Sequence, residues 1–221
     1  MYTNPGIFTV KLTVSDNNHS DSYIITDYII IHDLPNSDFS ESINIICQYD
    51  KVVFTDQSNS FANIVDWIWD FGDGGSSNLQ NPIYYYPNDG IYNVSLLVRD
   101  DNGCENILVA TNLIEVKQIP AADFSSDIKI SCDSVQSINF INNSSNANDF
   151  TWIFGDGNFS FDNEPVHLYT AGVFDVVLIA NNGICLDSFE VSNYIEVGAN
   201  VLTEFSVDAD SNCKNVELNF I

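Results

Sequence analysis

The sequence predicts an all-β chain made of repeated two-layer sandwiches. Short runs rich in Ile, Val, Tyr and Phe alternate with polar residues at period two, and turns rich in Asn, Asp and Gly separate them. No stretch keeps apolar residues at the i, i+3, i+4 and i+7 positions that a helix requires. Of the 221 residues, 45% are hydrophobic and 13% are aromatic, which is sufficient for packed cores.

An internal repeat sets the domain organisation. Asp70-Phe71-Gly72-Asp73-Gly74 corresponds to Ile153-Phe154-Gly155-Asp156-Gly157, and Trp69 lies 83 residues before Trp152. Two complete repeats are therefore expected, over residues 35–118 and 119–198. Residues 1–34 match only the last third of a repeat, and residues 199–221 match only its beginning. We expect this chain to be a window from a longer array.

The strands of a repeat follow from the alternation of side chains. Trp69 and Phe71 share one face of a strand, as Trp152 and Phe154 do in the second copy, so these four residues are expected in the cores. Gly-Asp-Gly then supplies a tight reversal. About seven short strands per repeat fit an immunoglobulin-like sandwich.

A tyrosine precedes the last two strands of each repeat. Tyr86 lies four residues before Gly90, and Tyr169 lies three residues before Gly172. We expect both tyrosines in the core. Their hydroxyls are placed to tie down the loop that enters the next strand, as in a tyrosine corner.

Trp-Asp-Phe-Gly-Asp-Gly, followed by Asn81-Pro82, Tyr86 and residues 90–96, resembles the signature of PKD (polycystic-kidney-disease-type) domains. The resemblance covers both complete repeats and accounts for both fragments. With its regularly placed cysteines, the chain is similar to tandem PKD arrays in surface proteins of Bacteroidota, including gliding adhesins. The resemblance implies an extracellular binding or scaffold module without its own chemistry.

Five cysteines fall at equivalent places in the repeats, Cys47, Cys132 and Cys213 early and Cys104 and Cys185 late. Such regularity in an acidic β chain indicates disulfides. The simplest scheme pairs Cys47 with Cys104 and Cys132 with Cys185. In an immunoglobulin-type path those turns lie at opposite poles, about 25 Å or more apart, whereas a disulfide needs Cα atoms within about 7 Å. A bridge between repeats, Cys47 to Cys185, is therefore favoured, with Cys104 and Cys132 pairing outside this window; both schemes stay open.

The charge and the lengths of the apolar runs exclude two classes of partner, nucleic acid and the membrane interior. Asp and Glu number 31 against six Lys and Arg, giving a formal charge of −25. Such a chain has no cationic surface for nucleic acid, and no run is long and apolar enough to insert into a membrane. Neighbouring repeats, other copies in a filament, and a glycan or surface ligand remain as partners.

Catalytic and cofactor motifs are missing from the sequence. There is no nucleophile elbow and no phosphate-binding loop, so the chain is not expected to be an enzyme. Asp73 and Asp156 recur in the Gly-Asp-Gly turns, where turn chemistry is the simpler explanation and Ca²⁺ ligation the alternative. No other cofactor is expected.

Taken together, these patterns predict a non-catalytic, extracellular or cell-surface array that forms a stiff stalk or filament. The alternative is a spacer or substrate-binding accessory region of a secreted hydrolase.

Overall fold

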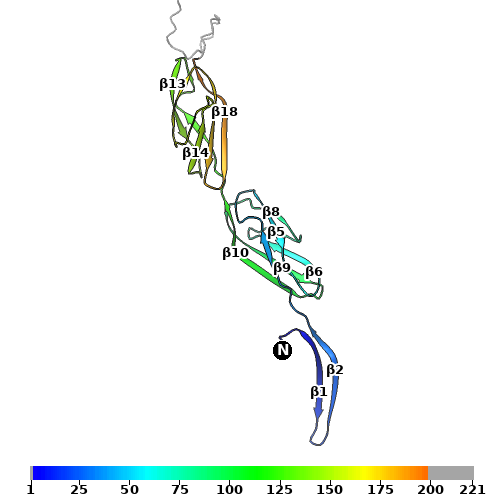
Figure 1. Cartoon of the computed structure of the whole chain (residues 1–221). Coiled ribbons are helices and arrows are strands. Elements are labelled where there is room, and N and C mark those ends of the chain that lie inside the picture. Colours follow the sequence, from blue (N-terminus) through cyan, green and yellow to red (C-terminus); the bar gives the residue numbers. More distant parts are fainter. Residues whose placement is uncertain (1, 199–221) are drawn as a thin grey trace, which may run out of the picture. The chain divides into compact units, whose positions relative to one another are not determined.

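The computed structural model describes residues 2–198 (Figure 1). These residues form strands joined by turns and loops, and they contain no helix that could span a membrane. The chain divides into two compact units, with the boundary between Val116 and Lys117. The strands are β1 (Gly6–Ser15), β2 (Ser20–Ile31), β3 (Phe39–Glu41), β4 (Ile45–Cys47), β5 (Lys51–Asp56), β6 (Ile64–Asp70), β7 (Ser76–Ser77), β8 (Ile83–Tyr85), β9 (Gly90–Asp100), β10 (Glu105–Lys117), β11 (Phe124–Ser126), β12 (Ile130–Ser131), β13 (Val135–Asn142), β14 (Asp149–Ile153), β15 (Phe159–Ser160), β16 (Val166–Thr170), β17 (Gly172–Asn181) and β18 (Leu186–Val197).

The two complete repeats have the same sheet topology. In the first, a five-stranded sheet of order β4-β10-β9-β6-β7 accompanies a three-stranded sheet β3-β5-β8. In the second, β12-β18-β17-β14-β15 accompanies β11-β13-β16. The fold is therefore all-β and built from immunoglobulin-like sandwiches, each with a long final pair of antiparallel strands.

Each sandwich has its own core between its two sheets. Side chains that alternate along the strands fill it, because period two directs every second residue to the opposing sheet. The first core contains Ile46, Val52, Phe54, Trp69, Phe71, Tyr86, Val94, Leu96, Val98, Ile114 and Val116. The second contains Phe124, Ile138, Phe140, Trp152, Phe154, Tyr169, Val176, Leu178, Tyr194, Ile195 and Val197.

Aromatic rings form the centre of both cores. Trp69 and Trp152 are completely buried, and each packs against a phenylalanine of the facing sheet, Phe54 at 5.5 Å and Phe140 at 5.2 Å between ring centroids. At about 25 cal/mol per Å² and roughly 200 Å² of ring surface, burying one such tryptophan stabilises a repeat by at most about 5 kcal/mol.

The two core tyrosines bond differently from a tyrosine corner. The Tyr86 hydroxyl donates to the carbonyl oxygen of Phe71 at 3.2 Å, and the Tyr169 hydroxyl donates to that of Phe154 at 3.0 Å. Both acceptors lie 15 residues upstream, at the start of the Gly-Asp-Gly turn, and not in the loop beside the tyrosine. The hydroxyl therefore fastens one sheet to the other, because a buried hydroxyl must find an acceptor.

The first glycine of the Gly-Asp-Gly turn is required for steric reasons. Gly72 has φ +83°, and a Cβ there would lie 2.3 Å from the carbonyl oxygen of Asn93 in β9. Gly155 has φ +80° and the same 2.3 Å approach to Asp175 in β17. Only glycine fits where a left-handed backbone passes this close to another strand.

Strands β1 and β2 form a separate two-stranded sheet (Figure 1, blue). Their antiparallel register runs from Gly6 opposite Ile31 to Ser15 opposite Ser20, with a bulge that shifts the register between Phe8 and Val10. The hairpin corresponds in sequence to β9–β10 and β17–β18. The expected beginning of a further repeat, residues 199–221, lies outside the described residues.

Candidate functional site

The Gly-Asp-Gly turn of the first repeat uses its aspartate to hold the turn together. Asp73 accepts the backbone N–H of Gly75 at 3.0 Å, and both carboxylate oxygens lie 2.9 Å from the hydroxyl of Tyr84. The Tyr84 ring stacks on Phe71 with centroids 3.8 Å apart. Burial, with the hydrogen bond and negative charge of Asp73, raises the pKa of Tyr84 to about 12. The hydroxyl therefore stays protonated and donates to Asp73.

The equivalent turn of the second repeat replaces the tyrosine by histidine. The Asp156 carboxylate accepts two hydrogen bonds from Asn158, one from the backbone N–H and one from the side-chain amide, both at 3.0 Å. It also lies 2.8 Å from Nε2 of His167. The His167 ring stacks on Phe154 at 4.0 Å and 4° between planes. Burial raises the pKa of Asp156, but the hydrogen bonds from His167 and Asn158 outweigh it, so the pKa lies below its usual value.

The partners of the turn aspartates were not recognised in the sequence as partners. Tyr84 and His167 hold equivalent registers, opposite Val52 in β5 and Ile138 in β13. Their separation of 83 residues equals that of the two turns, and both residues carry a polar atom at the far end of a flat ring. This shared offset was the available signal.

The metal candidates Asp73 and Asp156 are engaged by protein groups. Within residues 2–198 no group of three His, Cys, Asp or Glu side chains is arranged to hold a metal ion. The geometry of both turns is that of Asx-type turn chemistry, in which the carboxylate accepts a backbone N–H two residues later.

The early and late cysteines of the first repeat lie at opposite ends of one strand. Cys104 immediately precedes β10, and Cys47 is the last residue of β4. β4 lies beside the other end of β10, where the Glu115 N–H donates to the Asn44 carbonyl at 2.8 Å. The 13 residues of β10 span about 40 Å. Cys47 is disulfide-bonded and Cys104 is free, so the alternative Cys47–Cys104 pairing is not the one adopted.

The second repeat places its cysteines in the same way. Cys132 directly follows β12, which runs parallel to β18 with Ser131 opposite Val197, and Cys185 directly precedes β18. The 12 residues of β18 span about 36 Å. Both cysteines are disulfide-bonded, yet this separation excludes the alternative Cys132–Cys185 bond.

Each sandwich has a depression beside its strand ends, next to Trp67 in the first repeat and next to Phe150 in the second. In the first repeat a depression of about 380 Å³ contains Asp56, whose carboxylate accepts from the Trp67 indole at 2.7 Å and the Gln80 amide at 3.0 Å. Burial raises the pKa of Asp56, but these bonds and those from Ser58 outweigh it and lower the pKa. Asp56 thus holds the neighbouring segments together through hydrogen bonds, and it is not a proton donor at neutral pH.

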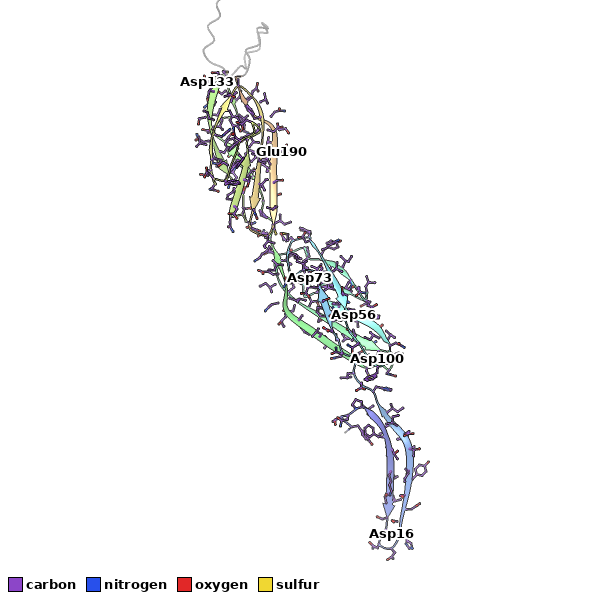
Figure 2. All side chains as sticks on the ribbon, in the orientation of Figure 1. Asp16, Asp56, Asp73, Asp100, Asp133 and Glu190 are labelled. Atoms are coloured by element: carbon purple, nitrogen blue, oxygen red, sulfur yellow. The ribbon has the colours of Figure 1, made fainter. Side chains whose placement is uncertain are left out.

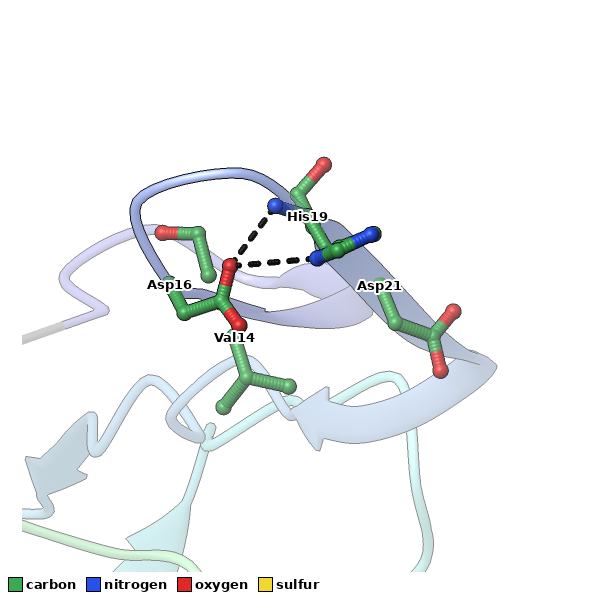
Figure 3. A pocket seen from close by; sticks show the side chains of 6 residues that line it. Val14, Asp16, His19 and Asp21 are labelled. Carbon is green, nitrogen blue, oxygen red and sulfur yellow. Dashed lines mark hydrogen bonds and ion pairs between the residues drawn. The ribbon is translucent and has the colours of Figure 1, made fainter.

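The hairpin turn between β1 and β2 forms a further depression of about 330 Å³ (Figure 3). Asp16 accepts the backbone N–H groups of Asn18 at 2.8 Å and His19 at 2.7 Å, and lies 3.5 Å from the His19 ring. Both side chains are largely exposed to solvent, at 73% and 86%. This arrangement is a solvated turn, because an exposed Asp–His contact lacks the shielding that tunes a catalytic pair.

Comparison with known proteins gives a consistent family. Residues 34–116 match the family model of the PKD domain. Collagenase ColQ1 of Bacillus cereus (strain Q1) is 49% identical over 43 residues, which are 20% of this chain and 4% of that protein. Pre-pro-metalloprotease PrtV of Vibrio cholerae serotype O1 is 46% identical over 46 residues, 21% of this chain and 5% of that protein. The chain thus spans only a small part of these relatives.

Two solved domains are similar over nearly their whole length. The PKD1 domain of Vibrio anguillarum Epp shows 30% identity and a TM-score of 0.35, covering 39% of this chain and 99% of that domain. The PKD1 domain of the Vibrio cholerae metalloprotease PrtV shows 31% identity and a TM-score of 0.34, covering 38% of this chain and 96% of that domain.

Proposed function

Because the chain belongs to the PKD domain family, we propose that it is a non-catalytic extracellular array whose repeats are tied end to end by disulfides into a stiff stalk or filament on a bacterial surface. The observation that carries the proposal is the state of the cysteines. Cys47, Cys132 and Cys185 are disulfide-bonded, Cys104 is free, and neither within-repeat pairing is compatible with the strands that separate the cysteines.

The pairing we propose is Cys47 with Cys185. Within the first unit, Cys47 lies beside the end of β10, the strand that leads into Lys117. Within the second unit, Sγ of Cys185 is 3.8 Å from the carbonyl oxygen of Lys117. Each cysteine therefore lies beside the same stretch of chain, whereas Cys132 is at the other end of β18. Cys132 is left for a cysteine outside residues 2–198, where Cys213 also lies.

Such a bridge gives the array a covalent path for force. Tension that enters before Cys47 would cross to Cys185 without extending the residues between them. The entropy lost by the unfolded chain when so long a loop is closed corresponds to about 4–5 kcal/mol of stabilisation. The bridge would also limit bending where the chain passes from one repeat to the next.

The strand arrangement of a repeat supports a mechanical role. β12, near the start of the second repeat, runs parallel to β18 at its end. The N–H of Glu196 donates to the Lys129 carbonyl at 2.8 Å, and that of Gly198 donates to the Ser131 carbonyl at 2.9 Å. Once the bridge is reduced, force that pulls the two ends of a repeat apart makes these parallel neighbouring strands slide in opposite directions, and their hydrogen bonds are strained together, not one after another.

Single-molecule stretching of the full chain, held at its two ends, tests the proposal. In oxidising buffer, residues 48–184 are expected to stay hidden from the applied force. Adding reductant then releases these 137 residues (184 − 48 + 1), a gain of about 45 nm at about 3.4 Å per residue.

Two serine variants provide the matched control. Cys104→Ser removes the free thiol and is expected to stretch like the unchanged chain, whereas Cys185→Ser is expected to extend further before reductant is added. If reduction leaves the extension of the unchanged chain the same, the covalent path does not exist and the proposal fails.

The second candidate is an accessory region of a secreted hydrolase. It is favoured by the relatives, one named as a collagenase and one as a metalloprotease. The mass of the native polypeptide that carries this sequence separates the two candidates. A remainder of catalytic-domain size that the repeats do not account for would favour the accessory region, and a mass made up of repeats would favour the stalk.

An extracellular location is part of both candidates. Disulfides persist in oxidising compartments, and the Vibrio cholerae metalloprotease PrtV carries a PKD1 domain that is similar to this chain. The acidic residues occur in the hairpin and in both sandwiches (Figure 2), and a formal charge of −25 keeps such a surface soluble. Neighbouring repeats, other copies, or a glycan or surface ligand would be its partners.

A further inference from the structure

The second repeat carries a pair of exposed phenylalanines that the first repeat lacks. Phe159 in β15 lies opposite Ile153 and is 64% exposed, and Phe161, two residues later, is 70% exposed. The two rings contact each other edge to face, with their centroids 5.4 Å apart. Ser76 holds the place of Phe159 in the first repeat, because Ser76 pairs with Asp70 as Phe159 pairs with Ile153. Single exposed aromatic residues are ordinary, but packing does not require a contacting pair that only one of two matching repeats has.

Phe161 borders the depression of the second repeat, whose volume is about 760 Å³, twice that of the depression in the first repeat. The two depressions occupy corresponding places. Phe150 lies where the first repeat has Trp67, since each is followed by the buried tryptophan of its strand. Asn163 likewise lies where the first repeat has Gln80. A depression of this volume is large enough for a small ligand.

Five polar side chains line the depression of the second repeat, those of Asn148, Asp149, Thr151, Asn163 and Asn181. Within residues 2–198, the side chains of Asn148, Asp149 and Thr151 form no hydrogen bond or ion pair with another residue. Asn163 and Asn181 each use the amide oxygen, which accepts one hydrogen bond at 2.8 Å and 2.7 Å respectively. Their amide N–H groups remain for a ligand. The depression therefore offers donors and acceptors that the fold itself does not use.

The first repeat has an ion pair in the corresponding part of its sheet. Arg99 lies opposite Asp66 and binds its carboxylate at 3.2 Å. In the second repeat Asn181 lies opposite Asp149, so an amide replaces the cation. One carboxylate among neutral amides and a hydroxyl repels an anionic ligand. It favours a neutral ligand that is rich in hydroxyl groups.

We propose that this depression binds a neutral saccharide, with a pyranose ring packed on Phe161 and its hydroxyls bonded to the polar side chains around it. The C–H bonds on one face of a pyranose carry partial positive charge and pack against the negative face of an aromatic ring. The Asp149 carboxylate accepts sugar hydroxyls in charge-assisted hydrogen bonds, and the asparagine amides both donate and accept. The formal charge of −25 opposes an anionic ligand and a second copy of the chain.

The inference deepens the proposed function, on which it rests for the extracellular surface where a glycan is met. It assigns a ligand class to the second repeat and none to the first. It makes no use of the Cys47–Cys185 bridge. The stretching experiment and a binding experiment can therefore fail independently of each other.

Titration of the isotope-labelled full chain with neutral oligosaccharides, followed by amide chemical shifts, tests the inference. The probes are oligosaccharides of glucose, mannose, galactose and N-acetylglucosamine. Because the depression is open and offers one ring for stacking, the expected Kd is about 0.1–10 mM. Shifts are expected at residues 148–151 and 159–163, and not at the equivalent residues 65–68 and 76–80 of the first repeat.

Two alanine variants show whether the exposed ring binds. Phe161→Ala is expected to raise the Kd about tenfold or more, whereas Phe61→Ala, at a 96% exposed phenylalanine of the first repeat, should leave it within about twofold. Both side chains are exposed, so neither variant should disturb folding. The inference is wrong if none of the oligosaccharides shifts these amides at about 10 mM, or if Phe161→Ala binds as tightly as the unchanged chain.

A cationic peptide is the competing ligand, because a carboxylate beside aromatic rings also suits a lysine or arginine side chain. Asp149→Asn distinguishes the two ligands. This variant keeps an acceptor oxygen and should bind the saccharide within about threefold, but it lacks the charge that attracts a cation. Oligolysine that shifts the same amides, loses its binding in Asp149→Asn and in salt, and binds where no saccharide does would overturn the inference.

Discussion

Gly72→Ala is expected to destabilise the first repeat far more than Gly74→Ala, two residues away in the same turn. Both glycines have positive φ, +83° and +95°. An alanine Cβ at position 74 meets nothing within 4 Å, whereas at position 72 it meets the Asn93 carbonyl oxygen at 2.3 Å. The pair therefore separates backbone strain from steric overlap.

The magnitudes follow from these two contributions. Placing an L-residue in the left-handed region costs about 1–2 kcal/mol and applies to both variants. Relieving the contact at position 72 to an ordinary 3.4 Å requires a shift of about 1 Å (3.4 − 2.3) in β9, which pairs on both sides and whose Asn93 accepts the Asn112 N–H at 2.7 Å. Such overpacking costs about 1–3 kcal/mol more.

Urea unfolding followed by tryptophan fluorescence measures the difference. Trp67 and Trp69 report on the first repeat, and Trp152 reports on the second. With a denaturant slope of about 1–2 kcal/mol per M, the Gly72→Ala midpoint should lie about 0.5–3 M below that of Gly74→Ala. Gly155→Ala and Gly157→Ala repeat the comparison in the second repeat. Equal midpoints for Gly72→Ala and Gly74→Ala would refute the steric argument.

Three other predictions concern the core, the turns and metal binding. Trp69→Ala should cost about 3–5 kcal/mol of unfolding free energy, and Phe61→Ala, at a side chain that is 96% exposed, should stay within about 0.5 kcal/mol; similar urea midpoints for the two would contradict the packing described. The folded pKa of Asp156 lies below its unfolded value of about 3.9, so the stability that this carboxylate contributes is complete above that value and is lost as the pH falls through the folded pKa. Acid should therefore lower the melting temperature of the unchanged chain more than that of Asp156→Asn. Equal dependence of the two melting temperatures on pH would count against the His167 contact. Calcium and EDTA should give the same melting temperature, since Tyr84 and His167 occupy the turn carboxylates, and a rise with calcium would restore the metal alternative.

Much of the fold could be predicted from the sequence because its signals are local or repeated. Side-chain alternation indicates strands wherever one face is buried, and the Trp69–Trp152 offset aligned the two sandwiches. The Gly-Asp-Gly motif indicated a tight reversal, because glycine tolerates positive φ wherever it occurs in a chain.

Contacts between distant strands could not be predicted in this way. The hydroxyl of Tyr86 was expected to fasten its own loop, but it bonds to Phe71 on the opposite sheet. Tyr84 and His167 hold the turn aspartates, and no local pattern marks either residue as a partner of its turn. Each partner lies 11 to 15 residues away across the sandwich, and local propensity carries no information about such a meeting.

The sequence by itself determined that this chain is all-β, repeated and acidic, with cysteines at equivalent positions of the repeats. The reason is that side-chain alternation, amino-acid composition and the spacing of motifs can all be obtained from the residues without knowing their contacts. Only the tertiary structure decided which atoms the turn aspartates meet and why Gly72 cannot be replaced. It also showed that Phe161, Asp149 and Asn181 line one depression. The reason is that burial and bonding distance depend on how strands pair and sheets pack, which the residues specify jointly and not one by one.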